Sequence, residues 1–281
     1  MTDPVSMRSR RPAQLVIDEL LRQHGATPPR SAFARFFGVS PLAADSVSWY
    51  LGATGEIEVG RILAQLPPEW TVFHALPIGT KNTDLDHLVV GPGGVFTINT
   101  KYHSGKTVWV GKRTVMINGR KHPYLRAAES EANKVTKLIQ ERMPLPAPAR
   151  PLIVVVDPKS LTIKERPEMV TVLTAQQLRR WLTKRPAILS SQDLAQLVEI
   201  FDNPASWRQE SAGDPGDARL RFEALHAEAR SAHTRRVVWS LAGTLAIFGA
   251  AWALVMGGGT AWFVSALTGL FGSLAVGWRG T

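Results

Sequence analysis

Two carboxylates, an amide and an ammonium recur at alternate positions within residues 84–101. They are Asp84 and Asp86 in the first half and Asn99 and Lys101 in the second. In a β-strand, residues two apart point to the same face, so each pair shares a face of its strand. Such groups are costly to bury unless they pair with one another or hold a metal ion. Oxygen ligands beside a lysine suit Mg²⁺-dependent chemistry on a phosphate.

A predicted β-hairpin brings these groups together. Residues 84–90 and 95–101 read as strands, and glycines and a proline at 91–94 form a turn cluster between them. If the turn is centred between Pro92 and Gly93, the register places Asp86 opposite Asn99 and Asp84 opposite Lys101, all on one face. His87 points to the other face, where we expect a hydrogen-bonded core histidine.

The segments GATGEIEVGRILAQL and DLDHLVVGPGGVFTINTKYHSGK resemble the nuclease-related domain (NERD) family, which is similar to the PD-(D/E)XK nuclease superfamily. The resemblance runs from about Gly52 to Ile139 and more loosely through residues 151–184. It implies that Glu56 is the helical glutamate, Asp86 the metal-binding aspartate and Lys101 the catalytic lysine. It also implies Mg²⁺ as cofactor, with Asp86, Asn99 and Glu56 as its ligands.

One position departs from the superfamily pattern. Asn99 stands where that pattern has Glu or Asp. Its amide oxygen is a neutral and therefore weaker ligand for a hard cation. Two readings of this face stay open: a metal-dependent endonuclease, or a structural ion pair between Asp86 and Lys101 at the end of a strand.

A basic block follows the hairpin. Residues 111–150 contain nine Lys or Arg against three Asp or Glu, in a chain with a net charge of +10. Such a surface beside a phosphate-cleaving site suits a polyanion, so Arg126, Lys134 and Lys137 are predicted to bind nucleic acid. A solvated basic face and a surface for anionic lipid headgroups are the alternatives.

The C-terminal segment contains no charged residue from Val237 to Trp278. Gly257, Gly258 and Gly259 divide it into halves of about 20 residues, each long enough to cross a hydrocarbon core. We therefore expect a transmembrane hairpin that contacts the lipid bilayer through residues 237–278. Arginines flank both ends, which predicts a multi-pass protein of the cell membrane with both termini and the soluble domain cytoplasmic.

The remaining pattern predicts an α/β domain. Helical and strand segments alternate, and the apolar run at 152–157 suits a strand buried on both faces. The expected fold class is a mixed central sheet flanked by helices, as in restriction endonucleases, followed by the transmembrane hairpin. The predicted domains are an N-terminal helical extension at 1–45, a nuclease-related domain at 46–205, a linker and juxtamembrane helix at 206–236, and the hairpin at 237–279.

These features leave a small set of functions. The absence of cysteine excludes a disulfide framework and a thiolate zinc site. The predicted function is that of a membrane-anchored nuclease-related protein that hydrolyses DNA with Mg²⁺ at the cytoplasmic face. The alternative is a catalytically inactive nucleic-acid-binding or interaction module on the membrane.

Overall fold

The computed structural model describes residues 6–25, 28–78, 84–144, 147–208 and 215–255. The chain divides into two compact units. The first comprises residues 1–22 and 45–219, and the second comprises residues 23–44 and 220–281. The candidate site residues all belong to the first unit.

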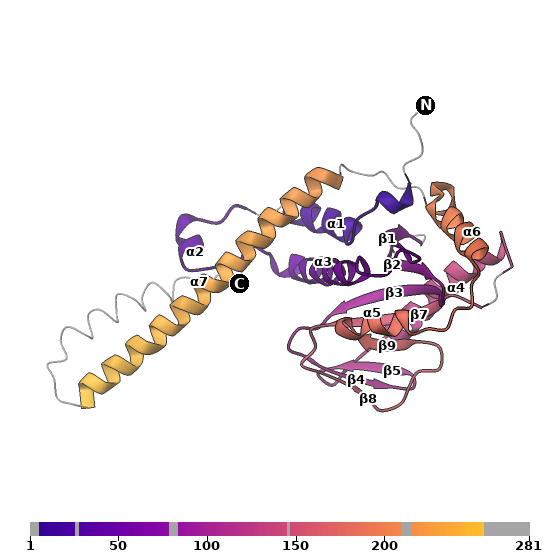
Figure 1. Ribbon diagram of the computed structural model, residues 1–281. Coiled ribbons are helices and arrows are strands. Elements are labelled where there is room, and N and C mark those ends of the chain that lie inside the picture. Colours follow the sequence, from indigo (N-terminus) through magenta and orange to yellow (C-terminus); the bar gives the residue numbers. More distant parts are fainter. Residues whose placement is uncertain (1–5, 26–27, 79–83, 145–146, 209–214, 256–281) are drawn as a thin grey trace. The chain divides into compact units, whose positions relative to one another are not determined.

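A five-stranded mixed sheet forms the centre of the first unit, in the order β1-β2-β3-β7-β9 (Figure 1). Strands β1, β2 and β3 are antiparallel neighbours, whereas β3, β7 and β9 run parallel. The bounds are β1 Thr71–Pro77, β2 Asp84–Gly91, β3 Gly94–Tyr102, β7 Arg150–Val156 and β9 Thr171–Thr174. The predicted mixed central sheet is thus present.

Helices cover both faces of this sheet. They are α3 Ala44–Leu63, α4 Tyr124–Gln140, α5 Ala175–Thr183 and α6 Ser191–Asp202. The same unit also contains most of α1 Gln14–His24 and the short 3₁₀ turns η1 Met7–Ser9 and η2 Pro204–Ser206. Leu88 in β2 shares a buried cluster with residues of α4 and α6. The next residue, Val89, shares a second cluster with residues of α3 and α5. The alternation along β2 therefore places α4 and α6 on one face and α3 and α5 on the other.

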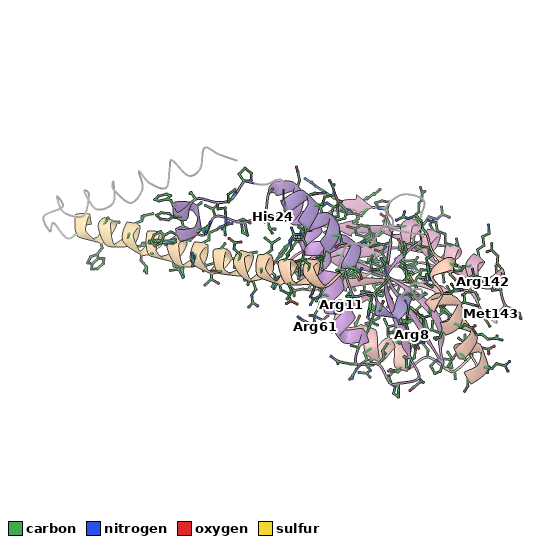
Figure 2. All side chains as sticks on the ribbon, turned by 90° about the horizontal axis from the view of Figure 1, so that it is seen from above. Arg8, Arg11, His24, Arg61, Arg142 and Met143 are labelled. Atoms are coloured by element: carbon green, nitrogen blue, oxygen red, sulfur yellow. The ribbon has the colours of Figure 1, made fainter. Side chains whose placement is uncertain are left out.

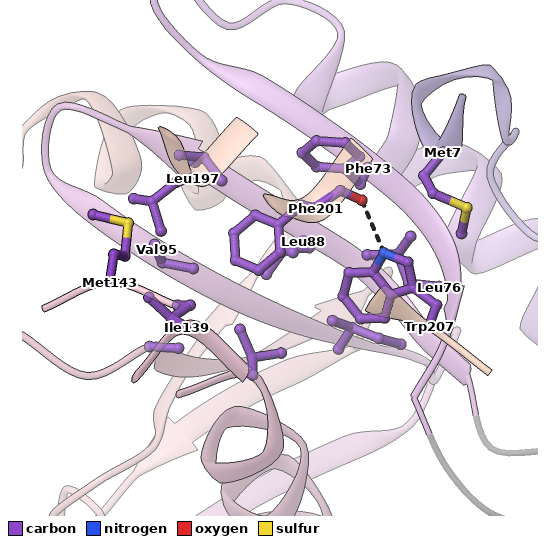
Figure 3. Close-up of a cluster of buried hydrophobic side chains, with 14 of the residues drawn as sticks. Met7, Phe73, Leu76, Leu88, Val95, Ile139, Met143, Leu197, Phe201 and Trp207 are labelled. Carbon is purple, nitrogen blue, oxygen red and sulfur yellow. Dashed lines mark hydrogen bonds between the residues drawn. The ribbon is translucent and has the colours of Figure 1, made fainter. Parts of the chain in front are cut away.

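The core beneath α4 and α6 is shown in Figure 3. Phe73 meets Phe201 with ring centroids 6.0 Å apart, and the Trp207 indole nitrogen donates a 2.8 Å hydrogen bond to the Phe201 carbonyl oxygen. Asp202, at the end of α6, accepts a hydrogen bond from the side chain of Arg8, a residue labelled in Figure 2. These contacts join the N-terminal turn to α6.

A second sheet of four strands, in the order β6-β5-β4-β8, packs against the start of α4. Its strands are β4 Thr107–Gly111, β5 Thr114–Ile117, β6 Arg120–His122 and β8 Ser160–Ile163. Apolar residues of β4 and β5 pack with Leu125 and Ala128 of α4 and with Ile153 of β7. This contact helps to hold α4 in place over the central sheet.

The second unit contains α2 Ala32–Phe36 and most of α7 Pro215–Val255. The Trp239 indole nitrogen donates a 3.0 Å hydrogen bond to the Phe36 carbonyl oxygen, and their rings lie 5.0 Å apart. Arg236 donates to the carbonyl oxygen of Gly38. Tilted aromatic contacts and these hydrogen bonds hold α2 against α7.

The predicted transmembrane hairpin is wrong. Within the described ranges, no helix has both the length and the apolar character needed to cross a membrane. Residues 237–255 form no separate span. They continue α7, whose earlier turns carry many charged side chains, because nothing in the sequence ends the helix between the two segments. The second predicted span, from residue 256 onward, lies outside the described residues.

Two further predictions that depended on the hairpin are also not supported. Contact with a lipid bilayer through residues 237–278 and a multi-pass location in the cell membrane both depended on two spanning helices. The described part of the chain contains none. The fold class is corrected to a mixed α/β core with two sheets and flanking helices.

Candidate active site

The site lies where the β2–β3 hairpin stops pairing. Gly91 pairs with Gly94 across the predicted turn, and the ladder continues to His87 opposite Ile98. Continuing this register by one residue places Asp86 opposite Asn99, as predicted. Beyond the last backbone pair, the two strands are linked by a side chain. Asp86 Oδ2 accepts a 2.5 Å hydrogen bond from the backbone N–H of Thr100.

Asn99 and Lys101 lie near the end of β3 and face α4. Asn99 is buried, with 8% of its surface exposed, whereas Lys101 is partly exposed. The Lys101 ammonium lies 5.1 Å from the ring centre of Tyr124, the first residue of α4. None of the ion pairs found in the described part of the chain includes Lys101. An Asp86–Lys101 ion pair therefore does not account for this face.

Glu56 reaches the site from α3. Its side chain is almost completely buried, and the backbone N–H of Ala13 donates a hydrogen bond to the carboxylate. Burial raises the pKa of Glu56 well above its usual value, and the charges of Asp86 and Asp84 raise it further. The lysine acts in the opposite direction. These influences show that Glu56, Asp84, Asp86 and Lys101 share one electrostatic environment.

Glu131 of α4 belongs to the same site, and the sequence reasoning did not identify it. The Asn99 amide nitrogen donates hydrogen bonds of 2.9 Å and 3.1 Å to the two carboxylate oxygens of Glu131. The contact joins residues 32 positions apart, so no local spacing indicates it. The available signal was a helix expected beside the predicted site that carries two acidic residues, Glu129 and Glu131, among three basic ones.

Charge and burial act together on the acidic residues of the site. The pKa of Asp86 is raised to about 6, and burial is the largest cause. The charge of Lys101 acts to lower this pKa, and the charge of Glu131 acts to raise it. Burial also raises the pKa of Glu131, whereas the hydrogen bond from Asn99 and the charge of Lys101 lower it. The carboxylates therefore repel one another in a poorly hydrated place. A bound cation would relieve that repulsion.

The donor atoms fit a hard divalent cation. Glu56 Oε2 and Asn99 Oδ1 are both buried, and neither has a hydrogen-bond partner. Buried polar atoms normally have partners, so two such oxygens beside Asp86 need an explanation. Among the described residues, no three His, Cys, Asp or Glu side chains are grouped closely enough to hold a metal ion by themselves. Mg²⁺ is commonly held by one or two carboxylates, and waters and phosphate oxygens complete its coordination. These residues can provide the carboxylates.

The predicted nucleic-acid-binding residues lie on α4. Arg126, Lys134 and Lys137 are all exposed, whereas Glu131 of the same helix is partly buried against Asn99. Lys134 is close enough for its charge to lower the pKa of Glu131. Helix α4 therefore contributes a carboxylate to the site and cations to the surface beside it.

His87 is a core residue, as predicted. It is fully buried on the opposite face of β2, and its Nδ1 lies 2.8 Å from Nδ1 of His74 in β1. Burial lowers the pKa of His74 to about 4 and also lowers that of His87. The pair shares one hydrogen bond between neutral rings and takes no part in the site.

The match to a family model agrees with the sequence resemblance. Residues 51–156 match the family model NERD, described as the nuclease-related domain, and this range contains Glu56, Asp86, Asn99, Lys101 and Glu131. No curated protein matches the chain. A solved structure, that of Pyrococcus furiosus SfsA in complex with Ca²⁺, is 12% identical, with a TM-score of 0.23. The match covers 46% of this chain and 56% of that one.

Proposed function

We propose, from the premise that residues 51–156 form a nuclease-related domain, that the protein hydrolyses phosphodiester bonds of DNA with a divalent cation. The observation that carries the proposal is the pair of buried oxygens without hydrogen-bond partners, Glu56 Oε2 and Asn99 Oδ1. They lie in the site that contains Asp86 and Lys101. Buried oxygens are normally paired, and a bound cation would give both of these oxygens a partner.

Each side chain of the candidate site would have its own role in this reaction. Mg²⁺, when bound, would supply Lewis-acid polarisation of the scissile phosphate. Asp86 and the Asn99 amide oxygen would hold the cation, and Glu56 would join them after losing its proton. A water oxygen bonds to phosphorus as the bond to the leaving sugar oxygen breaks. The attacking water gives up one proton to solvent, and the leaving oxygen takes up one proton from solvent. Lys101 stabilises the negative charge that develops on the phosphate.

Substrate contact is assigned to the outer surface of α4. Arg126, Lys134 and Lys137 are exposed cations on the helix that supplies Glu131. Phosphate contacts of this kind give affinity without sequence preference. A DNA strand lying along α4 would bring a phosphate toward the end of β3.

A second candidate function follows from Asn99. Its amide nitrogen is engaged by Glu131, and a neutral oxygen is a weak ligand. A domain with this site could bind nucleic acid without cleaving it. In that case the cations of α4 would carry the function alone.

A cleavage assay separates the two candidates. The purified full chain is incubated with plasmid DNA and with single-stranded DNA, in Mg²⁺, in Mn²⁺ or in chelator. We expect cleavage that requires the metal and falls at least about 100-fold in Lys101→Ala, which removes a group that stabilises the transition state. DNA binding without cleavage in either metal would support the second candidate and refute the first.

A further inference from the structure

A hollow of about 660 Å³ lies beside β9, at the edge of the central sheet. Residues of β9, of α5 and of the segment after β8 line it. It shares no residue with the candidate active site. Pockets that hold small molecules have volumes of this order, about 300–1,000 Å³. The hollow is therefore large enough for an organic ligand.

The floor of the hollow is apolar. Val172 and Leu173 of β9 contribute to it, and Ile163 is 43% exposed there. Trp181 of α5 also lines it and packs edge-on against Phe96, with ring centroids 5.7 Å apart. A flat apolar group could cover this surface and remove it from water.

The rim is cationic. Arg166, Arg180, Lys184 and Arg185 line the hollow, and its lining contains no acidic residue. The Arg185 guanidinium is held 4.5 Å from the ring centre of Trp181, and its Nε donates to the Trp181 carbonyl oxygen at 3.3 Å. One cation of the rim is thus fixed before any ligand arrives.

The other rim cations lack counter-charges. The side chains of Arg166, Arg180 and Lys184 take part in none of the hydrogen bonds or ion pairs found among the described residues. Glu168, an acid near Arg166 in sequence, pairs instead with Lys112 at 2.7 Å. Helix α5 carries no acid, and it packs on the sheet through Ala175, Leu178, Leu182 and Trp181. The cations therefore do not serve to hold α5 in place.

We propose that this hollow binds a nucleoside phosphate. Its base would cover the apolar floor, and its phosphate would meet the rim, where guanidinium groups offer paired donors. Gln176, which is exposed and lines the hollow, offers an amide that can hydrogen-bond a base edge. A free nucleotide and the terminal nucleotide of a DNA strand present the same chemistry. The site does not rest on the proposed nuclease activity.

Calorimetric titration of the full chain tests the proposal, in chelator so that no divalent cation contributes. The probes are AMP, inorganic phosphate, a 5′-phosphorylated oligonucleotide, the same oligonucleotide without phosphate, and an oligoglutamate peptide. We expect AMP or the phosphorylated oligonucleotide to bind at least about tenfold more tightly than phosphate. Equal affinity for AMP and the oligonucleotide assigns the site to free nucleotides. Tighter binding of the oligonucleotide assigns it to strand ends.

A charge-reversal variant localises the binding. Arg180→Glu should weaken it about tenfold or more, because it replaces a charge-assisted donor with a like charge. Lys159→Glu, an equal charge change at an exposed position away from the hollow, should leave the affinity within about twofold. The proposal is overturned if no nucleotide binds, if phosphate or oligoglutamate binds as tightly, or if the two variants weaken binding equally.

Discussion

The amide nitrogen of Asn99 lies 2.9 Å from one carboxylate oxygen of Glu131 and 3.1 Å from the other. At this place β3 thus supplies an amide, and α4 supplies the carboxylate that lies beside it. The pair places one carboxyl group beside one amide. It also leaves Asn99 Oδ1 without a hydrogen-bond partner.

Replacing Asn99 tests this relationship. Asn99→Asp removes the donor and sets two buried carboxylates side by side, so it should lower the free energy of unfolding by about 1–3 kcal/mol without metal. The same variant should bind Mg²⁺ or Mn²⁺ more tightly, because a carboxylate is the better ligand. Urea unfolding with and without Mn²⁺ measures both effects.

A double variant provides the control. Asn99→Asp combined with Glu131→Gln exchanges amide and carboxylate and restores a hydrogen bond between them. The double variant should regain most of the free energy of unfolding that Asn99→Asp loses. A double-mutant cycle measures this recovery as a coupling energy between the two residues. Additive losses in the cycle would show that the two residues do not act as a pair.

Glu56→Gln should stabilise the folded protein at neutral pH when no metal is present. The pKa of Glu56 is raised, so its contribution to stability is greatest below about 4.5 and is lost as the pH rises through the folded-state value. Glutamine does not titrate and escapes this loss. Thermal unfolding at pH 5 and pH 8 should show a stabilisation that is larger at pH 8.

Glu58→Gln is the matched control on the same helix. Glu58 is partly exposed and pairs with Arg61 at 3.3 Å, an interaction of small energy at a surface. A Glu56→Gln effect no larger than that of Glu58→Gln would contradict the buried, repelled carboxyl described here.

The His74–His87 pair predicts a pH effect of opposite sign. Burial lowers both pKa values, that of His74 to about 4, so the stability from neutral rings is complete above about 6.5. It is lost as the pH falls from 6.5 toward 4, because the unfolded state binds protons first. His74→Gln should reduce the slope of unfolding free energy against pH in that range. An unchanged slope would refute the prediction.

The cations of α4 predict a salt-dependent contact with DNA. Lys134→Ala with Lys137→Ala should weaken binding and reduce the slope of log affinity against log salt by about one or more. Fluorescence anisotropy with a labelled duplex at several salt concentrations measures this. Lys159→Ala with Lys164→Ala, at two other exposed positions, should change the slope less. Equal slopes in wild type and the α4 variant would leave the helix without a role in binding.

The hairpin was predictable because its signals are local. The turn cluster at 91–94 set the register, and the alternation of Leu88, Val89 and Val90 set the faces of the sheet. Glu131 was not predictable, because its contact with Asn99 depends on how α4 lies over β3. The position of Lys101 beside Tyr124 was not predictable for the same reason, because Tyr124 is the first residue of α4.

The C-terminal segment shows a different limit. A charge-free run predicted two spanning helices, yet the described part of that run continues the charged helix α7. Hydropathy reports where charges are absent, but it does not report where a helix begins. The prediction that a new helix begins at residue 237 was wrong, and the predicted membrane location depended on it.

The most direct test of the account is a Mn²⁺ titration of the full chain, followed by electron paramagnetic resonance. We expect one saturable site per chain. Asp86→Ala should abolish it, and Glu141→Ala, a change at an exposed acid just after α4, should leave it intact. Lys101→Ala should keep the site and lose cleavage, because the lysine stabilises charge on the phosphate and does not hold the cation. Saturable binding of equal affinity in wild type and Asp86→Ala would contradict the claim that this hairpin holds a metal ion.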